Sequence, residues 1–123
     1  YLNEHNCLLM LEPGRFISAP ACTLVTNILQ VHGSTVVVDA SVYQGDTDAF
    51  VVPAKLLVEG ELEKGEGQAF IIKGLTPCSM DLFRYRVYLD NPKKGDVLTF
   101  LNAGAYNFTT DFCDLPVLET VLE

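Results

Sequence analysis

L-L-M-L-E-P-G-R, residues 8–15, is the stretch that decides how the beginning of this chain folds. The apolar run from Cys7 to Leu11 is typical of a strand that is buried on both faces, as in a parallel sheet or a barrel. Pro13 and Gly14 end such a strand, because proline donates no ladder hydrogen bond and glycine favours a turn. We therefore expect a buried strand that stops before Pro13.

Glu12 and Arg15 lie at the exit of this predicted strand. A carboxylate in that position is costly to bury unless a cation or a hydrogen-bond donor meets it. Two interpretations are open from the residues alone. The strand delivers functional groups at its carboxyl end, or Glu12 forms a salt bridge with a neighbouring Lys or Arg in an ordinary strand-to-helix turn.

The next segment, Phe16 to Val31, has the apolar spacing of an amphipathic helix, at positions 17, 21, 24, 25, 28 and 31. Ser18 can cap its start, and Pro20 is tolerated in a first turn. Gly33 gives a natural end. The pattern predicts one helix across this segment.

From residue 35 onward the chain changes to short runs of β-forming residues separated by Gly, Asp, Asn and Pro. This spacing predicts a small β-barrel or sandwich. We expect residues 1–33 to form a connecting strand and helix and residues 34–123 to form a β-domain. The predicted strands are Thr35 to Val42, Phe50 to Val52, Leu56 to Glu61, Ala69 to Lys73, Phe83 to Leu89 and Val97 to Leu101.

The charge and composition limit the functions that fit. The net charge of −8 disfavours phosphate backbones and anionic membranes as partners, so nucleic acid and membrane binding are not expected. No apolar run is long enough to span a membrane, and a cytoplasmic location is expected. The four cysteines are scattered without metal-ligand spacing, so we expect reduced thiols and no metal site.

Four motifs, in order along the chain, carry a family resemblance. They are E-P-G-R-F-I-S-A-P-A-C-T-L-V-T-N-I from residue 12, G-L-T-P-C-S-M-D from residue 74, G-D-V-L-T-F from residue 95 and N-A-G-A-Y from residue 102. Together they resemble the C-terminal part of the fold-type III pyridoxal-phosphate decarboxylases, which include the ornithine, diaminopimelate and arginine decarboxylases. Each motif alone is weak, but four at plausible spacings are specific. The resemblance runs from about Leu8 to about Pro116.

The resemblance implies a mainly β fold, a small Greek-key β-barrel or sandwich like the C-terminal domain of alanine racemase, preceded by one barrel-type strand and one α-helix. It also implies a (β/α)₈ barrel upstream in the same protein, of which residues 1 to about 16 would be the last strand. Relatives of this kind form homodimers with composite active sites.

The resemblance further implies which residues contact pyridoxal 5'-phosphate. Glu12 matches the family's glutamate at the pyridine nitrogen, where an anion keeps that nitrogen protonated. Gly14 and Arg15 match its phosphate-binding pair, and Tyr106 matches the tyrosine whose hydroxyl reaches the same phosphate. Without the resemblance, Tyr106 would be interpreted as a core aromatic residue after a strand.

The loop from Gly74 to Asp81 departs from the family's Gly-Pro-x-Cys-x-x-x-Asp motif, because Pro77 stands where the cysteine is usual. In one interpretation Cys78 guides protonation in the partner's active site, with Ser79 and Asp81 predicted to bind substrate. In another, Cys78 takes the substrate-contact position and the proton donor differs. A buried structural thiol is the third alternative.

The function implied is that of a pyridoxal-phosphate-dependent amino-acid decarboxylase. This segment alone should be inactive, since the family's Schiff-base lysine lies early in the barrel. The run Ala49 to Val52 and the position after Cys78 lack the acidic group that would receive a far amine, so we expect a substrate other than a simple diamine precursor. The alternatives are a non-catalytic regulatory homologue and an unrelated β-barrel module that binds ligands through Phe83, Tyr85 and Tyr88.

Overall fold

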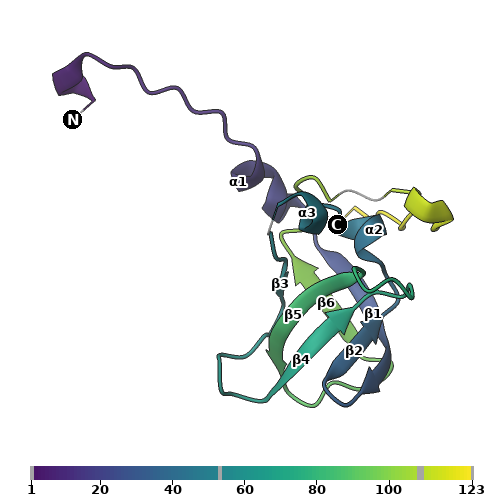
Figure 1. Ribbon diagram of the computed structural model, residues 1–123. Coiled ribbons are helices and arrows are strands. Elements are labelled where there is room, and N and C mark those ends of the chain that lie inside the picture. The colour runs from purple at the N-terminus through teal and green to yellow at the C-terminus, as the bar shows by residue number, and fades with distance from the viewer. Residues whose placement is uncertain (1, 53, 108–109, 123) are drawn as a thin grey trace.

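A single curled sheet organises the protein in our computed structural model, which describes residues 2–52, 54–107 and 110–122. The strand order is β3-β6-β1-β2-β4-β5, and neighbouring strands are antiparallel except for the parallel pair β2 and β4. Figure 1 shows that the sheet curls into a nearly closed barrel. The strands are β1 (Leu24–His32), β2 (Thr35–Val38), β3 (Leu57–Val58), β4 (Gln68–Lys73), β5 (Leu82–Leu89) and β6 (Val97–Leu101). The predicted mainly β, barrel-like fold is confirmed.

The predicted helix from Phe16 to Val31 is wrong. Helical structure covers only α1 (Arg15–Ser18) and the 3-10 turn η2 (Ala19–Ala21), and β1 follows. Along β1, Thr26 and Ile28 are buried, while Val25, Asn27 and Leu29 are exposed. The segment is rich in β-branched residues, and pairing with β2 and β6 outweighs an apolar spacing that suits either structure.

The predicted strand from Phe50 to Val52 is also wrong, because most of it lies in a helical turn. Two such turns, α2 (Val42–Gly45) and α3 (Asp48–Val51), follow β2. Ser41 starts α2 with a capping box, in which its side chain accepts a hydrogen bond from the backbone and Gln44 bonds back to the Ser41 N–H at 3.0 Å. The remaining strand predictions are confirmed in position, with β2 and β3 shorter than expected. Short 3-10 turns also occur at η1 (Asn3–His5) and η3 (Phe112–Asp114).

The segment before α1 is extended and projects away from the barrel (Figure 1). The predicted strand at Cys7 to Leu11 has no strand partner among the described residues, and Leu8 and Met10 are 100% and 83% exposed. Large apolar side chains are seldom left in water over such a stretch. Its place in an upstream barrel remains a prediction.

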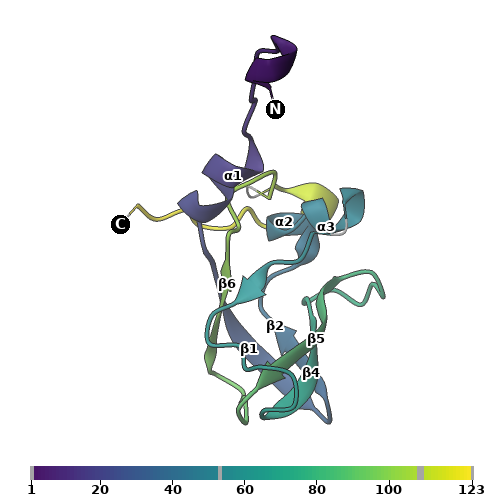
Figure 2. The same cartoon turned by 90° about the vertical axis from the view of Figure 1, so that its left-hand side faces the viewer.

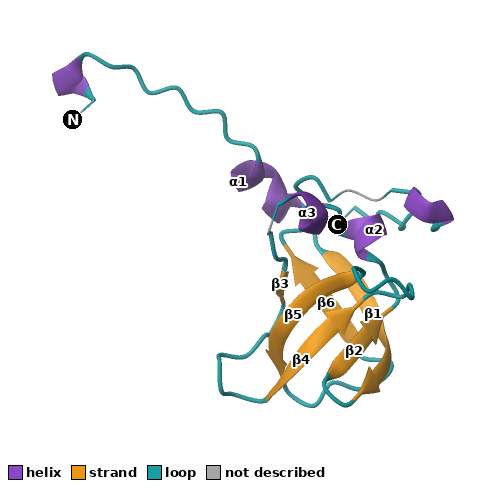
Figure 3. Cartoon of the chain, in the orientation of Figure 1, coloured by secondary structure: helices purple, strands orange, loops and turns teal. Residues whose placement is uncertain are grey.

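The core fills the barrel with aliphatic and aromatic side chains from all six strands. The rings of Phe83 and Phe100 stack with their centroids 4.6 Å apart at its centre. Figure 3 shows α1, α2 and α3 gathered at one end of this barrel. The core includes Ile28, Val36, Val38, Val58, Phe70, Ile72, Phe83, Val87, Leu98 and Phe100.

Replacement of Phe100 by alanine should lower the free energy of unfolding by about 3 to 5 kcal/mol, because the ring is fully buried and leaves a cavity. Urea unfolding monitored by circular dichroism measures this loss. The control is Val97→Ala, on the same strand but 63% exposed, for which a loss below about 1 kcal/mol is expected. Equal losses would contradict the assigned core face of β6.

Candidate cofactor-binding site

Three segments that are distant in sequence meet at the end of the barrel where the helical turns lie (Figure 2). They are the start of α1, the loop between α2 and α3, and the segment that follows β6. Two backbone hydrogen bonds join the residues just after α1 to the segment after β6: Ala103 N–H donates to the Cys22 carbonyl at 2.9 Å, and Gly104 N–H donates to that of Ala19 at 3.0 Å. A side chain at residue 104 would collide with the Ser18 carbonyl at the end of α1, so glycine permits this close approach.

Arg15 lies at the centre of this meeting point. Its guanidinium forms an ion pair with the carboxylate of Asp48, which is only 5% exposed. The same group lies 5.2 Å from the centroid of the Tyr106 ring, within the range of a cation–π contact. The hydrogen bond with Asp48 raises the pKa of Arg15, so this residue is a permanent cation.

Tyr106 is held by its backbone in the left-handed region, with φ of +58°, and its ring is largely exposed. The hydroxyl of Thr47 donates to the Tyr106 carbonyl at 2.9 Å, and the Asp48 N–H donates to the Asn107 side chain at 2.9 Å. These bonds hold the two loops together. A Cβ atom on Gly14 would lie 2.9 Å from the Tyr106 hydroxyl, so a side chain there would press on it.

The structure therefore brings together the three residues predicted to bind phosphate. We call these three residues, together with Asp46 and Asp48, the Arg15 cluster. It comprises Gly14, Arg15, Asp46, Asp48 and Tyr106. A guanidinium, a hydroxyl and a glycine without side-chain bulk are the groups that suit a phosphate. Glu12 is exposed on the extended segment two residues before Gly14, and no described residue is its partner. The predicted cofactor contacts of all four residues remain predictions.

Asp46 is a fully buried member of the Arg15 cluster. Neither of its carboxylate oxygens has a hydrogen-bond partner among the described residues. Burial and, to a lesser extent, the charge of Asp48 raise the pKa of Asp46, Arg15 lowers it, and the net result is a pKa of about 7. Asp46 therefore exchanges a proton near neutral pH.

The loop from Gly74 to Asp81 is organised by the Asp81 carboxylate, which is fully buried. One oxygen accepts from the Val42 N–H at 2.9 Å, and the other accepts from the Thr76 N–H and hydroxyl at 3.0 and 2.7 Å. A side chain on Gly74 would collide with this carboxylate. The predicted substrate contact of Asp81 stays a prediction, while its geometry here is that of a loop anchor.

Cys78 is partly buried, and its thiol lies 3.1 Å from the hydroxyl of Tyr43. That hydrogen bond, followed by one from the Met80 backbone, lowers the pKa of the Cys78 thiol. Tyr43 stacks on Phe50 and packs against Phe112, with centroid distances of 4.9 and 5.5 Å. Ser79 is exposed beside Cys78.

The sequence interpretation missed several residues of this region. The motif D-T-D between two apolar runs carried a usable signal, because acids so placed need partners when buried. The contacts themselves join residues 35 and 59 positions apart, and no local pattern predicts them. The missed residues are Tyr43, Asp46, Thr47, Asp48 and Asn107.

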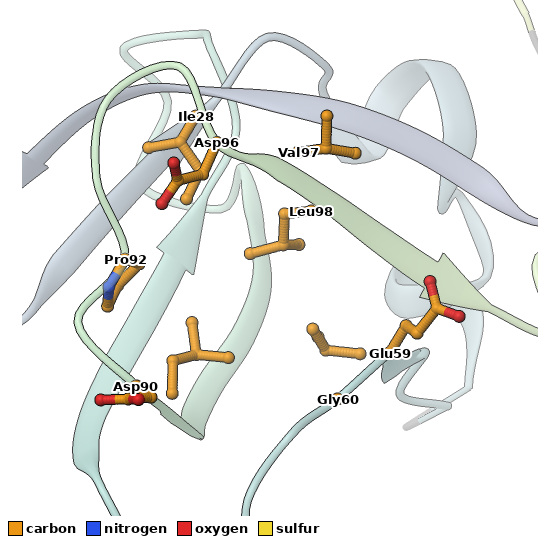
Figure 4. A pocket seen from close by; sticks show the side chains of 10 residues that line it. Ile28, Glu59, Gly60, Asp90, Pro92, Asp96, Val97 and Leu98 are labelled. Atoms are coloured by element: carbon orange, nitrogen blue, oxygen red, sulfur yellow. The ribbon is translucent and has the colours of Figure 1, made fainter.

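Two hollows lie outside the Arg15 cluster. A groove of about 690 Å³ runs between residues 21–25 and 118–122. A second hollow, of about 220 Å³, lies against the β5–β6 turn (Figure 4). Glu59, Asp90 and Asp96 stand around it in that view, and their charges repel a phosphate. Neither hollow is lined by residues of the cluster.

Two general features of the described residues bear on function. None of their helices has the length and apolar character needed to cross a membrane. They also contain no group of three or more His, Cys, Asp or Glu side chains placed to hold a metal ion.

Comparison with known proteins identifies the family. The family model described as "Pyridoxal-dependent decarboxylase, C-terminal sheet domain" matches residues 16–104. No curated protein sequence matches the chain.

Solved structures agree with this match. A lysine/ornithine decarboxylase from Vibrio vulnificus, complexed with cadaverine, is 26% identical with a TM-score of 0.73, over 89% of this chain and 32% of its own. A diaminopimelate decarboxylase from Helicobacter pylori, the I148L mutant complexed with L-lysine, is 25% identical with a TM-score of 0.73. The match covers 87% of this chain and 28% of that enzyme.

A carboxynorspermidine decarboxylase from Campylobacter jejuni shares the fold, with a TM-score of 0.71 and 18% identity. The match covers 92% of this chain and 35% of that enzyme. The chain thus spans about a third of the length of these enzymes. The match over residues 16–104 shows that the chain belongs to the family of C-terminal sheet domains of pyridoxal-dependent decarboxylases.

Proposed function

We propose that this chain is the C-terminal part of an enzyme that decarboxylates an amino acid with pyridoxal 5'-phosphate, and that the Arg15 cluster holds the cofactor's phosphate. The observation that carries the proposal is the meeting of Gly14, Arg15 and Tyr106, which come from segments about ninety residues apart in a family that uses this cofactor. The whole protein's activity goes beyond this chain, because the chain lacks most of the length of its solved relatives.

The groups present fit a phosphate. The guanidinium has five N–H donors, so Arg15 can bond to Asp48 and still offer donors to an anion. The Tyr106 hydroxyl adds one donor, and the missing Gly14 side chain leaves room beside it. When bound, the cofactor supplies an electron sink that allows the bond between the α-carbon and the carboxylate to break.

Glu12 would lie at the pyridine nitrogen. It stands at the end of an exposed extended segment, next to the residues that would hold the phosphate. A carboxylate at that nitrogen favours its protonated form, since an opposite charge nearby stabilises a cation. The residue's role is thus to hold a proton on the ring.

The loop from Gly74 to Asp81 would carry the group that handles the proton at the reacting carbon of a partner subunit in a homodimer. Cys78 fits this role because Tyr43 bonds its thiol and favours the thiolate. Ser79 is exposed beside it and would face the far end of the substrate. Asp81 keeps the loop in shape through its three hydrogen bonds.

The substrate would be a small amino acid or derivative other than a simple diamine precursor. The run Ala49 to Val52 is apolar, and the nearest acid before it, Asp48, is ion-paired with Arg15. No carboxylate in that run is available to receive an alkylammonium group.

A non-catalytic regulatory homologue is the second candidate, favoured by the position of Pro77 where the family's cysteine is usual. The retained Arg15 and Tyr106 support the enzyme instead, because a protein without cofactor needs no phosphate ligands. Family membership excludes the unrelated binding module.

Cofactor affinity in the full-length protein tests the phosphate assignment. Arg15→Ala and Tyr106→Phe should each weaken pyridoxal-phosphate binding roughly tenfold or more, because a charge-assisted hydrogen bond contributes about 1.5 to 3 kcal/mol. Fluorescence titration measures the dissociation constants. Arg86→Ala, at an exposed arginine on β5, is the matched control and should bind as the wild type does. Unchanged affinity in both cluster variants would refute the assignment.

The Tyr43→Phe variant tests the thiol that the loop presents. It keeps the stacked ring and removes the hydroxyl, so the alkylation of Cys78 by iodoacetamide should need a higher pH. Mass spectrometry of the Cys78 peptide gives the rate at each pH. Tyr85→Phe, at an exposed tyrosine, is the control and should leave the profile unchanged. An unchanged profile in Tyr43→Phe as well would show that Tyr43 does not tune the thiol.

Subunit complementation tests whether the loop serves a partner. Inactive Cys78→Ala subunits, mixed with subunits that lack the barrel lysine, should recover up to roughly a quarter of wild-type activity, since random assortment gives half mixed dimers with one intact site of two. Activity after demonstrated subunit exchange is the measurement. No recovery would mean that Cys78 serves its own subunit or has no catalytic part.

A further inference from the structure

The Arg15 cluster contains two acidic side chains and one basic side chain. Asp46 lies just before α3 and Asp48 is the first residue of α3; the guanidinium of Arg15 pairs with Asp48, and its charge also acts on Asp46. Both carboxylates are buried, at 0% and 5% exposure, while Arg15 is partly exposed. Two carboxylates beside one guanidinium reduce the positive potential that would attract an anion.

The two acids differ in their partners. Asp48 is neutralised by its ion pair with Arg15. Asp46 has no hydrogen-bond partner for either oxygen among the described residues, and its side chain is fully buried. The described charges that act on Asp46 are those of Asp48 and Arg15, and no lysine or histidine contributes. A buried carboxylate in this situation is more stable with a proton than without one.

We propose that the phosphate site is proton-linked, so that the Arg15 cluster binds a phosphate dianion together with a proton taken up by the pair Asp46 and Asp48. This inference rests on the proposed role of Arg15 in holding the cofactor's phosphate. The proton goes from solvent to a carboxylate oxygen of the pair, and no other bond changes.

The linkage follows from charge balance. With Asp46 protonated, Arg15 and Asp48 cancel, and the dianion meets a cluster with no net charge. With Asp46 ionised, two carboxylates outnumber one guanidinium, and the dianion meets a cluster with a net negative charge. Because binding and protonation are reciprocal, the dianion raises the proton affinity of the pair by the factor by which the proton raises dianion affinity.

The pH dependence therefore has a definite direction. A phosphate monoester becomes dianionic above about pH 6, which improves binding as the pH rises to that point. The pKa of Asp46 is about 7, so the unliganded cluster loses its proton above neutral pH and its affinity falls. A phosphate site made of an arginine and a tyrosine alone would show the rise in affinity with pH but not the fall above neutral pH.

The test uses the full-length protein and 4'-deoxypyridoxine 5'-phosphate, which has the ring and phosphate but no aldehyde to form a Schiff base. Calorimetry from pH 6 to 9 should show wild-type affinity falling by roughly tenfold between pH 7 and 8.5. Asp46→Asn should lack this fall. Asp90→Asn, at an exposed acid outside the cluster, is the matched control and should behave as the wild type does.

Proton uptake is the second measurement in the same experiment. Titrations at pH 7.5 in buffers of different ionisation enthalpy should show roughly half a proton more taken up by the wild type than by Asp46→Asn. Equal pH profiles and equal uptake in the two proteins would overturn the linkage while leaving phosphate binding intact. Absence of binding in every variant would overturn the proposed function, and the linkage with it.

The thermal stability of the unliganded protein should also depend on the protonation of Asp46. The pKa of Asp46 is raised in the folded state, so its contribution to stability is full below about pH 4 and is lost as the pH rises through about 7. The midpoint of thermal unfolding of the wild type should fall between pH 5 and 8 relative to that of Asp46→Asn. If the variant does not fold, wild-type proton uptake is measured at pH 7.5 with methyl phosphate, which has no ring nitrogen to take up a proton, and its absence overturns the proposal.

Discussion

The ion pair between Arg15 and Asp48 is the interaction on which the rest of the site depends. It ties the segment that enters the barrel to the loop between α2 and α3, and the cation–π contact with Tyr106 adds the segment after β6. Because Asp48 is nearly fully buried, the loss of Arg15 would leave its charge without a partner. The ion pair therefore stabilises this end of the barrel and also holds Arg15 in the proposed phosphate site.

The same end of the barrel carries both groups of candidate functional residues. Tyr43 on α2 bonds to Cys78, and the loop that begins three residues later supplies Asp46 and Asp48 to the Arg15 cluster. The short helical turns between β2 and β3 thus support the proposed cofactor contacts and the proposed proton-handling loop together. The barrel provides a rigid support, since Phe100 and the neighbouring buried side chains fill its core.

Much of the fold could be predicted from the sequence. The strands from Gln68 to Leu101 alternate clearly between turns, and their positions are confirmed. The sequence predicts a helix over the segment that forms the strand from Leu24 to His32, because its apolar positions satisfy both a helical and a strand spacing. Pairing with β2 and β6 decides in favour of the strand. The meeting of Gly14, Arg15 and Tyr106 followed from motifs, whereas Asp46 and Tyr43 depend on long-range contacts that no local pattern encodes.

The most direct test of the account is an experimental structure of the full-length protein with pyridoxal 5'-phosphate bound. We predict the phosphate within hydrogen-bonding distance of the Arg15 guanidinium and the Tyr106 hydroxyl, at roughly 2.7 to 3.2 Å between heavy atoms. A phosphate bound elsewhere, with Arg15 engaged only by Asp48, would contradict the central claim that the Arg15 cluster is the cofactor's phosphate site.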